Sequence, residues 1–149
     1  MKITAKARYA LRILMDIGAH GDGSVRTIRE IGASQGISEK FISRIVVPLR
    51  RAGLVVTARG VRGGLSLGRF PAKITLLDIV EAMDGPLSLV HCLSRPGACR
   101  RHGACAAESA WRGVNDALAD ALRSVTLEQV VADDKRLSPA TQESPEYCI

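Results

Sequence analysis

The stretch QGISEKFISRIVVPLRRAGLVVTARGVRGGLSL, residues 35–67, combines a glycine-containing turn, a helical segment and a glycine-rich hairpin. Residues 35–37 supply the turn, and Ser38 follows as a helix N-cap. Apolar residues then recur at helical spacing, namely Phe41, Ile42, Ile45 and Val46. This order predicts the second half of a helix-turn-helix, in which the capped helix projects from the body and enters a DNA major groove.

Two helices are expected before this turn. Residues Ile3, Ala7, Ala10, Leu11, Leu14 and Ile17 form the apolar face of the first. Thr4 can cap this helix, and Gly18, Gly21 and Gly23 are expected to end it. Thr27 and Glu30 have the spacing of a capping box, which predicts a short second helix ending near Ser34.

Pro48 falls inside the helix that Ser38 begins. Proline removes one backbone hydrogen bond and crowds the preceding turn, so we expect a kink or a restart near Val47. Residues 49–52 would continue the helix, and Gly53 would occupy its C-cap.

The segment LVVTARGVRGGLSL, residues 54–67, predicts a two-stranded hairpin, because β-branched and apolar residues flank a glycine-rich turn. A hairpin that directly follows a helix-turn-helix is the expected wing, and its basic tip suits a narrow minor groove. The DNA-contacting residues predicted on the capped helix and the wing are Ser38, Lys40, Phe41, Ser43, Arg44, Arg59 and Arg62. Phe41 would either touch a thymine methyl group or anchor the helix.

Charge is distributed unevenly along the chain. Residues 1–73 hold 14 Lys and Arg against 4 Asp and Glu, whereas residues 74–149 hold 7 against 11. The basic half has the character of a polyanion binder, although charge alone fits a solvated basic face equally well. The helix-turn-helix and the hairpin decide in favour of double-stranded DNA as the partner.

Composition and length restrict the remaining classes. A chain of 149 residues suffices for one core with an extension, and it contains no apolar run near the roughly 20 residues of a membrane span. The amino terminus lacks the apolar block of a signal peptide, so we expect a cytoplasmic protein with no membrane association. No nucleotide-binding loop, paired-carboxylate motif or nucleophile motif is evident, so the chain is not expected to be an enzyme.

The carboxy-terminal half predicts further helices. Thr75 and Asp78 have capping spacing, and Gly85 would end the helix that they begin. A later apolar stripe comprises Ala110, Trp111, Val114, Leu118, Ala121 and Leu122. This helix could pack on its own subunit, but the small body available to cover it favours a second copy and hence a homodimer.

The expected fold is mainly α, a winged helix-turn-helix with a small β-hairpin wing and a long C-terminal dimerisation helix. Its segments are a DNA-binding domain over residues 1–88, a cysteine sensor loop over 89–108, a dimerisation helix with a short capped helix over 109–132, and a disordered tail over 133–149.

Three cysteines lie in the run HCLSRPGACRRHGAC, residues 91–105. Thiolates are the ligands that iron–sulfur clusters require, and Cys92, Cys99 and Cys105 are close enough in sequence to converge on one centre. Their C-x6-C-x5-C spacing lacks the C-x2-C pairs of structural zinc sites. Redox-active thiols, zinc and plain buried cysteines remain alternatives. Cys148, in the tail, is expected to be an incidental or oxidisable thiol.

Several of these motifs, in this order, resemble the bacterial IscR/NsrR-like winged-helix regulators over residues 1–132. The motifs are MKITAKARYALRILMDIG, QGISEKFISRI, PLRRAGLVVTARGVRGGLSL, the cysteine run, SAWRGVNDAL and VTLEQVV. The resemblance implies a homodimer on a palindromic operator, with the long helix crossing to the partner. It also implies an iron–sulfur cluster held by the three cysteines. A two-iron cluster is favoured over a four-iron cluster.

The chain departs from these regulators at the remaining cluster ligand. Some of them carry a histidine three residues after the last cysteine, where this chain has Glu108, and others carry a carboxylate near the start of the first helix, where it has Arg8. Glu108 is the first candidate ligand, and His91 and His102 are alternatives. Glu108 could instead be a solvated acid at a helix start. The chain could also be a cluster-free regulator of the same fold, controlled by thiol chemistry or by a partner protein.

Overall fold

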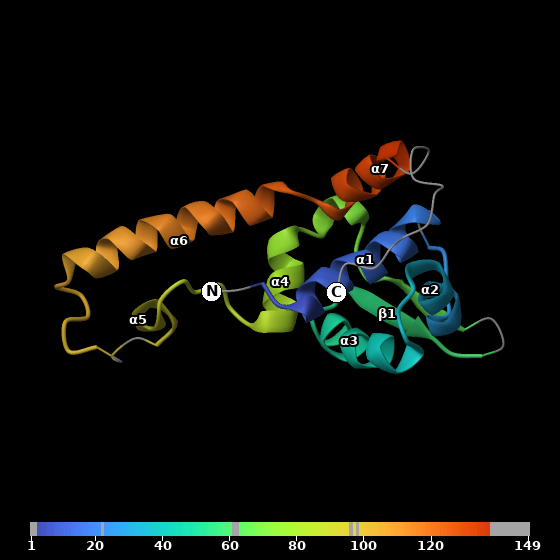
Figure 1. The fold of residues 1–149 in the computed structure, drawn as a ribbon, viewed down its shortest axis with the longest axis horizontal. Helices are drawn as coiled ribbons and strands as arrows, with labels where there is room; N and C mark the ends of the chain where they lie inside the picture. The colour runs from blue at the N-terminus through green and yellow to red at the C-terminus, as the bar shows by residue number, and fades with distance from the viewer. Residues whose placement is uncertain (1–2, 22, 61–62, 96, 98, 138–149) are drawn as a thin grey trace.

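The computed structural model describes residues 3–21, 23–60, 63–95, 97 and 99–137. Its elements, in chain order, are α1 (Ala5–Ala19), α2 (Ile28–Gln35), α3 (Glu39–Arg51), β1 (Val55–Ala58), β2 (Gly64–Leu67), the 3-10 helix η1 (Pro71–Lys73), α4 (Leu76–Asp84), α5 (His91–Ser94), α6 (Ala106–Ser124) and α7 (Leu127–Leu137). Figure 1 shows a winged body and one long helix, α6, that extends away from it. This mainly helical fold with a small hairpin confirms the predicted fold class.

The core of the body is built around α1, which contacts α2, α3, α4, α7 and β2. Its buried apolar face includes Ile13, Leu14 and Ile17, and it meets buried residues of the other elements, among them Ile31, Ile42, Leu49, Leu54, Ile79 and Leu127. Removing this apolar surface from water is the main contribution to stability.

Local capping starts the helices where the sequence predicts. Thr4 accepts a hydrogen bond from the Ala7 N–H (3.4 Å), and Thr27 with Glu30 forms a complete capping box. Thr75 and Asp78 form a second capping box at the start of α4. Each pair satisfies backbone N–H groups that have no partner inside the helix.

Helix α1 ends at Ala19, within the glycine segment that was predicted to end it, although Gly18 itself is still helical. Gly18 lies where α7 packs on α1, and a Cβ atom there would sit 3.3 Å from Cγ2 of Val131. The glycine therefore serves close helix packing.

The turn between α2 and α3 depends on two glycines. Gly36 adopts the left-handed conformation with a φ of 63°, and the Ile37 N–H donates to the Gly32 carbonyl (3.1 Å). A Cβ on Gly32 would lie 2.9 Å from the Ile37 carbonyl oxygen, so this return of the chain needs glycine. Ser38 then caps α3 by accepting from the Phe41 N–H (3.3 Å), as predicted.

The restart expected near Val47 is wrong, because α3 runs without interruption from Glu39 to Arg51. Pro48 lies in the last turns of the helix, where only one backbone hydrogen bond is lost, and buried neighbours such as Leu49 hold the segment in the core. The helix ends with the Gly53 N–H donating to Arg50 (3.1 Å) and the Leu54 N–H donating to Leu49 (3.0 Å). Ala52 is the C-cap, and Gly53 follows it at a φ of 69°.

The predicted hairpin is present. Strands β1 and β2 pair antiparallel, with Val55 opposite Leu67 and Ala58 opposite Gly64. The hairpin tip includes Arg59 and Gly60, whereas the predicted contact Arg62 lies outside the described residues.

The extension begins at α5, passes through the cysteines and returns along α6 to α7 (Figure 1). The Leu127 N–H donates to the Ile74 carbonyl (2.8 Å), which ties the start of α7 to the body. Helix α7 ends at Leu137, so residues 133–137 are helical rather than part of the expected tail. Residues 138–149, including Cys148, lie outside the described part of the chain.

Candidate functional site

Helix α3 has one buried face and one exposed polar face. Its buried residues are Ile42, Ile45, Val46 and Leu49, whereas the predicted base-facing residues Lys40, Ser43 and Arg44 are exposed. Ser43 Oγ donates to the Glu39 carbonyl (2.8 Å). The long basic side chains of Lys40 and Arg44 are therefore accessible to a ligand in front of α3.

Phe41 is half-buried and contacts α1 rather than projecting from the body. Its ring lies edge-on to Tyr9, with 5.2 Å between the ring centroids, and Arg12 lies over the Tyr9 ring at 5.6 Å. Arg12 Nη2 also donates to the Gln35 carbonyl (2.6 Å) at the end of α2. These contacts favour Phe41 as an anchor of α3.

A charged cluster that was not predicted from the sequence joins the wing to the helix-turn-helix. Asp16 on α1 is 5% exposed and pairs with Arg26, which lies in the loop between α1 and α2. An acid on the apolar face of the first helix was the available signal, because buried carboxylates require a partner.

The three cysteines lie in one segment at the far end of the extension. Cys92 lies in α5 and is half-buried, Cys99 is exposed, and Cys105 is the half-buried N-cap residue of α6; all three are free thiols. Within the described ranges, no three His, Cys, Asp or Glu side chains are grouped so that they could hold a metal ion. The thiols are therefore accessible, but the fold as it stands does not gather them around one centre.

Glu108 is held by its neighbours and is 7% exposed. Arg112 Nη2 donates to Glu108 Oε1 (2.7 Å), the Gly103 N–H donates to Oε2 (3.3 Å), and His102 Nδ1 lies 3.1 Å from Oε1. The Arg112 hydrogen bond, followed by that from Gly103, lowers the pKa of Glu108 against the opposing effect of desolvation. The interpretation of Glu108 as a solvated acid is therefore wrong. His91 is exposed.

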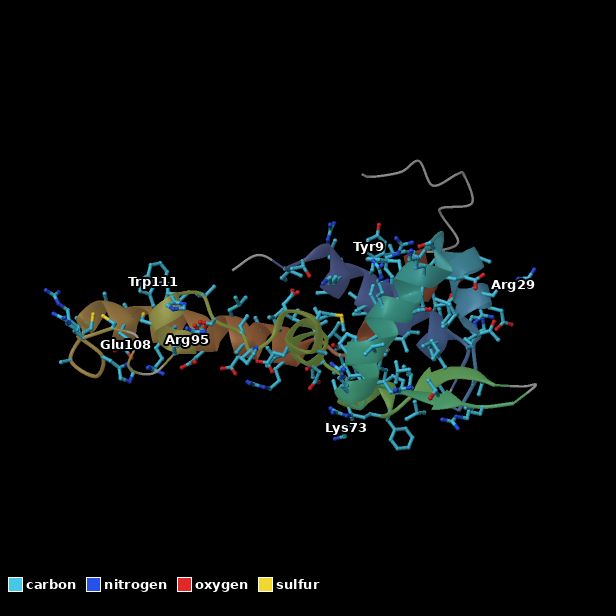
Figure 2. The ribbon with its side chains drawn as sticks, turned by 90° about the horizontal axis from the view of Figure 1, so that it is seen from below. Tyr9, Arg29, Lys73, Arg95, Glu108 and Trp111 are labelled. Carbon is cyan, nitrogen blue, oxygen red and sulfur yellow. The ribbon has the colours of Figure 1, made fainter. Side chains whose placement is uncertain are left out.

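Helix α6 presents large apolar side chains that the other described residues leave about half exposed. Trp111 is 48% exposed and Val114 is 53% exposed, and Glu108 is the only described residue of this helix that is buried. Figure 2 shows Trp111, Glu108 and Arg95 together on the extension, far from Tyr9 and Arg29 on the body.

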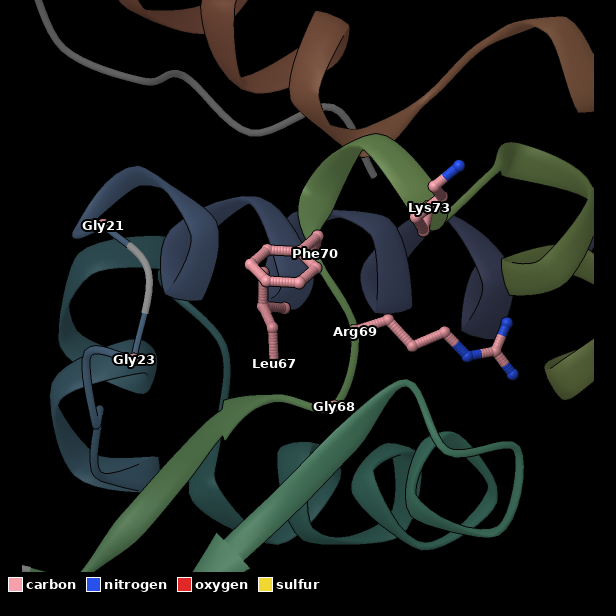
Figure 3. A pocket seen from close by; sticks show the side chains of 7 residues that line it. All are labelled: Gly21, Gly23, Leu67, Gly68, Arg69, Phe70 and Lys73. Atoms are coloured by element: carbon pink, nitrogen blue, oxygen red, sulfur yellow. The ribbon is translucent and has the colours of Figure 1, made fainter.

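A cavity of about 500 Å³ opens at the base of the wing, lined by Gly21, Gly23, Leu67, Gly68, Arg69, Phe70 and Lys73 (Figure 3). Among the described residues, its lining includes no cysteine and no predicted DNA-contacting residue. None of the helices in the described part of the chain is long and apolar enough to cross a membrane.

Helix α3, the second helix of the helix-turn-helix, is capped and has an exposed basic face, and it lies next to an arginine-bearing hairpin. This combination defines the class of winged helix-turn-helix DNA-binding regulators. The family model for Rrf2, described as "Iron-dependent Transcriptional regulator", matches residues 3–133. The chain belongs to the Rrf2 family.

Individual relatives agree with this assignment. The HTH-type transcriptional regulator CymR of Bacillus subtilis (strain 168) is 35% identical over 133 residues, which is 89% of this chain and 91% of that protein. The HTH-type transcriptional regulator IscR of Photorhabdus laumondii subsp. laumondii is 30% identical over 140 residues, covering 94% of this chain and 85% of that protein. These relatives are transcriptional regulators and not enzymes, as the sequence predicts for this chain.

Solved structures resemble the fold closely. The structure of CymR, described as the global cysteine regulator of B. subtilis, superposes with a TM-score of 0.73 at 32% identity, covering 89% of this chain and 98% of that one. T. potens IscR superposes with a TM-score of 0.67 at 26% identity and covers 99% of this chain and 95% of that one. The resemblance predicted from the motifs is thereby confirmed.

Proposed function

We propose that this transcription regulator binds operator DNA as a homodimer in the cytoplasm and that an iron–sulfur cluster at Cys92, Cys99 and Cys105 controls its affinity. The observation that carries this proposal is the placement of three free, accessible thiols in one segment between the winged body and an uncovered helix. Two elements that could couple to DNA binding, α4 and α6, flank this segment directly.

DNA recognition is assigned to α3 and to the wing. Lys40 and Arg44 project from the exposed face of α3 toward base edges, with Ser38 and Ser43 beside them, and Arg59 serves the wing. Arg62 remains a proposed contact at the wing tip. A two-fold dimer places two α3 helices on two half-sites, so the operator would be palindromic.

The exposed apolar side chains of α6 support the proposed homodimer. An amphipathic helix whose large apolar residues stay exposed needs a second surface, and a copy of the same stripe offers one. Trp111 is the expected centre of that interface because buried aromatic residues carry much of the binding energy at such surfaces.

The donor set of the cysteine segment fits an iron–sulfur cluster chemically. Thiolates are its usual ligands, and Cys92, Cys99 and Cys105 are free and not fully buried. When bound, such a cluster supplies one-electron redox chemistry; the two-iron form is favoured. Glu108 is proposed as the further ligand, and it would have to release Arg112 and Gly103 to serve. His91 and His102 are the alternatives.

Hydrogen bonds connect the start of the cysteine segment, residues 89–108, to α6, and they connect the residues directly before this segment to the body. The Leu89 N–H donates to Asn115 Oδ1 on α6 (3.1 Å), and the Leu87 N–H donates to Glu81 Oε1 on α4 (3.1 Å). Asp84, which ends α4, accepts from the backbone N–H (3.1 Å) and hydroxyl (2.5 Å) of Thr4 at the start of α1. Reordering of the segment can therefore shift α6 against the body, and a coupling of about 1–3 kcal/mol suffices for several-fold to hundredfold changes in affinity.

A cluster-free regulator controlled by thiol chemistry or by a partner protein is the second candidate. Two observations favour it: the carboxylate of Glu108 is already engaged, and a relative at 35% identity is CymR, whose structure is described as that of a cysteine regulator.

Anaerobic purification separates these candidates. We expect the wild-type chain to carry iron and acid-labile sulfide with visible absorption, and the C92S/C99S/C105S variant to carry neither, because serine is a poor cluster ligand. C148S, which alters the fourth cysteine of the chain, is the matched control and should retain both. A wild-type protein without iron and sulfide after anaerobic reconstitution would leave the cluster-free candidate in place.

A further inference from the structure

Arg26 contacts three separate elements of the winged body. Its Nε donates to Asp16 Oδ1 on α1 (3.1 Å), and its Nη1 lies 3.7 Å from Glu30 Oε1 on α2. Its backbone pairs with Leu65 of β2 in both directions, N–H to carbonyl at 2.8 Å each. One residue therefore joins the helix-turn-helix to the wing.

The wing lies unusually close to this residue. A Cβ atom on Gly64 would sit 2.7 Å from the Arg26 carbonyl oxygen and 2.8 Å from Cγ1 of Val25. Such distances are shorter than van der Waals contact, so a glycine at position 64 is what lets β2 rest against the Arg26 segment.

Asp16 extends the connection to the start of α3. Its carboxylate also accepts hydrogen bonds from Ser34 Oγ and from Gln35 Nε2 (3.3 Å), at the end of α2 and directly before the turn into α3. Because Asp16 is 5% exposed, solvent screens these interactions little.

We propose that Asp16 and Arg26 form a bracket that fixes the wing relative to α3, so that Arg59 and the α3 side chains reach one DNA duplex together. Both are positioning residues. The Arg26 side chain is 16% exposed and its charge is neutralised by Asp16, so it offers little to DNA directly.

The described part of the wing is attached to the body in two further ways, because Val55 and Leu65 are buried in the core and the base of the hairpin is tied to the end of α3. There the Gly68 N–H donates to the Leu54 carbonyl (2.9 Å), directly after the end of α3. An isolated two-stranded hairpin is marginally stable, so the orientation of the wing depends on such attachments. The bracket adds two backbone hydrogen bonds to β2 at Leu65 and links them to Asp16, which further restricts the orientation of the wing.

A double-mutant cycle tests this bracket. Arg26→Lys retains the positive charge but cannot make the two-pronged contact to Asp16 and Glu30, and Arg29→Lys is the matched control on an exposed neighbouring arginine (Figure 2). Each is combined with Arg59→Ala. Affinity is measured by fluorescence anisotropy on a duplex recovered by in vitro selection with the wild-type protein, after circular dichroism confirms folding.

In the wild-type and R29K backgrounds, R59A is expected to weaken binding about tenfold and to reduce the salt dependence by about one phosphate contact. In the R26K background, R59A should weaken binding less than about twofold and leave the salt slope unchanged, because the wing is already misplaced. Multiplicative effects of R26K and R59A would overturn the proposal. An R59A protein of wild-type affinity would also overturn it, and would remove the wing from the DNA interface. This proposal rests only on DNA binding through α3 and the wing, and its test does not depend on whether a cluster is bound.

Discussion

Replacing Asp16 with alanine is expected to lower the free energy of unfolding by about 3–5 kcal/mol, which is the usual cost of removing one partner of a buried ion pair. The substitution leaves the Arg26 guanidinium, 16% exposed, without its principal anion. It also removes the acceptor of Ser34 Oγ and Gln35 Nε2. Urea unfolding followed by circular dichroism measures the loss.

Asp116→Ala is the matched control for this experiment. Asp116 is exposed on α6 and has no ion-pair partner among the described residues, so its replacement should change stability by less than about 0.5 kcal/mol. A loss below about 1 kcal/mol for Asp16→Ala would show that the pair with Arg26 does not hold the body together.

Trp111→Asp is expected to convert the proposed dimer to a monomer and to weaken operator binding about a hundredfold or more. A buried carboxylate without a partner is costly, and truncating an aromatic residue at an interface removes much of the binding energy. Loss of the dimer uncouples the two half-sites, and linked sites gain a factor of about 10² to 10⁴ in overall affinity. Analytical ultracentrifugation and DNA titration measure the two effects.

Ser109→Asp adds the same carboxylate to α6 at an exposed position off the apolar stripe. This variant should remain dimeric and bind DNA as the wild type does. A monomeric wild-type protein, or a dimeric Trp111→Asp protein, would contradict the assignment of α6 as the interface.

Much of the winged body could be predicted because its signals are local. The capping pairs Thr27–Glu30 and Thr75–Asp78, and the left-handed turn at Gly36, act within a few residues of chain. The order of these signals was sufficient to predict the helix-turn-helix and its wing.

The features that were not predicted correctly have a different cause. They depend on contacts between residues that are distant in the sequence. Helix α3 continues through Pro48, whose neighbours are buried in the core, and Gly18 lies in α1 at the place where α7 packs on it. The Asp16–Arg26 pair joins residues that helical periodicity cannot relate. The alternative of Glu108 as a solvated acid fails because the partners that bury its carboxylate come from the cysteine loop and the next helical turn.

Central to the proposed function is that cluster binding at the cysteine segment controls the affinity of the winged body for operator DNA. It is tested most directly by titrating one selected operator duplex, under anaerobic conditions, with cluster-loaded and cluster-free wild-type protein and with the C92S/C99S/C105S variant. We expect the loaded and cluster-free wild-type proteins to differ several-fold to a hundredfold in affinity, and the variant to match the cluster-free form. Equal affinities for all three proteins would contradict it.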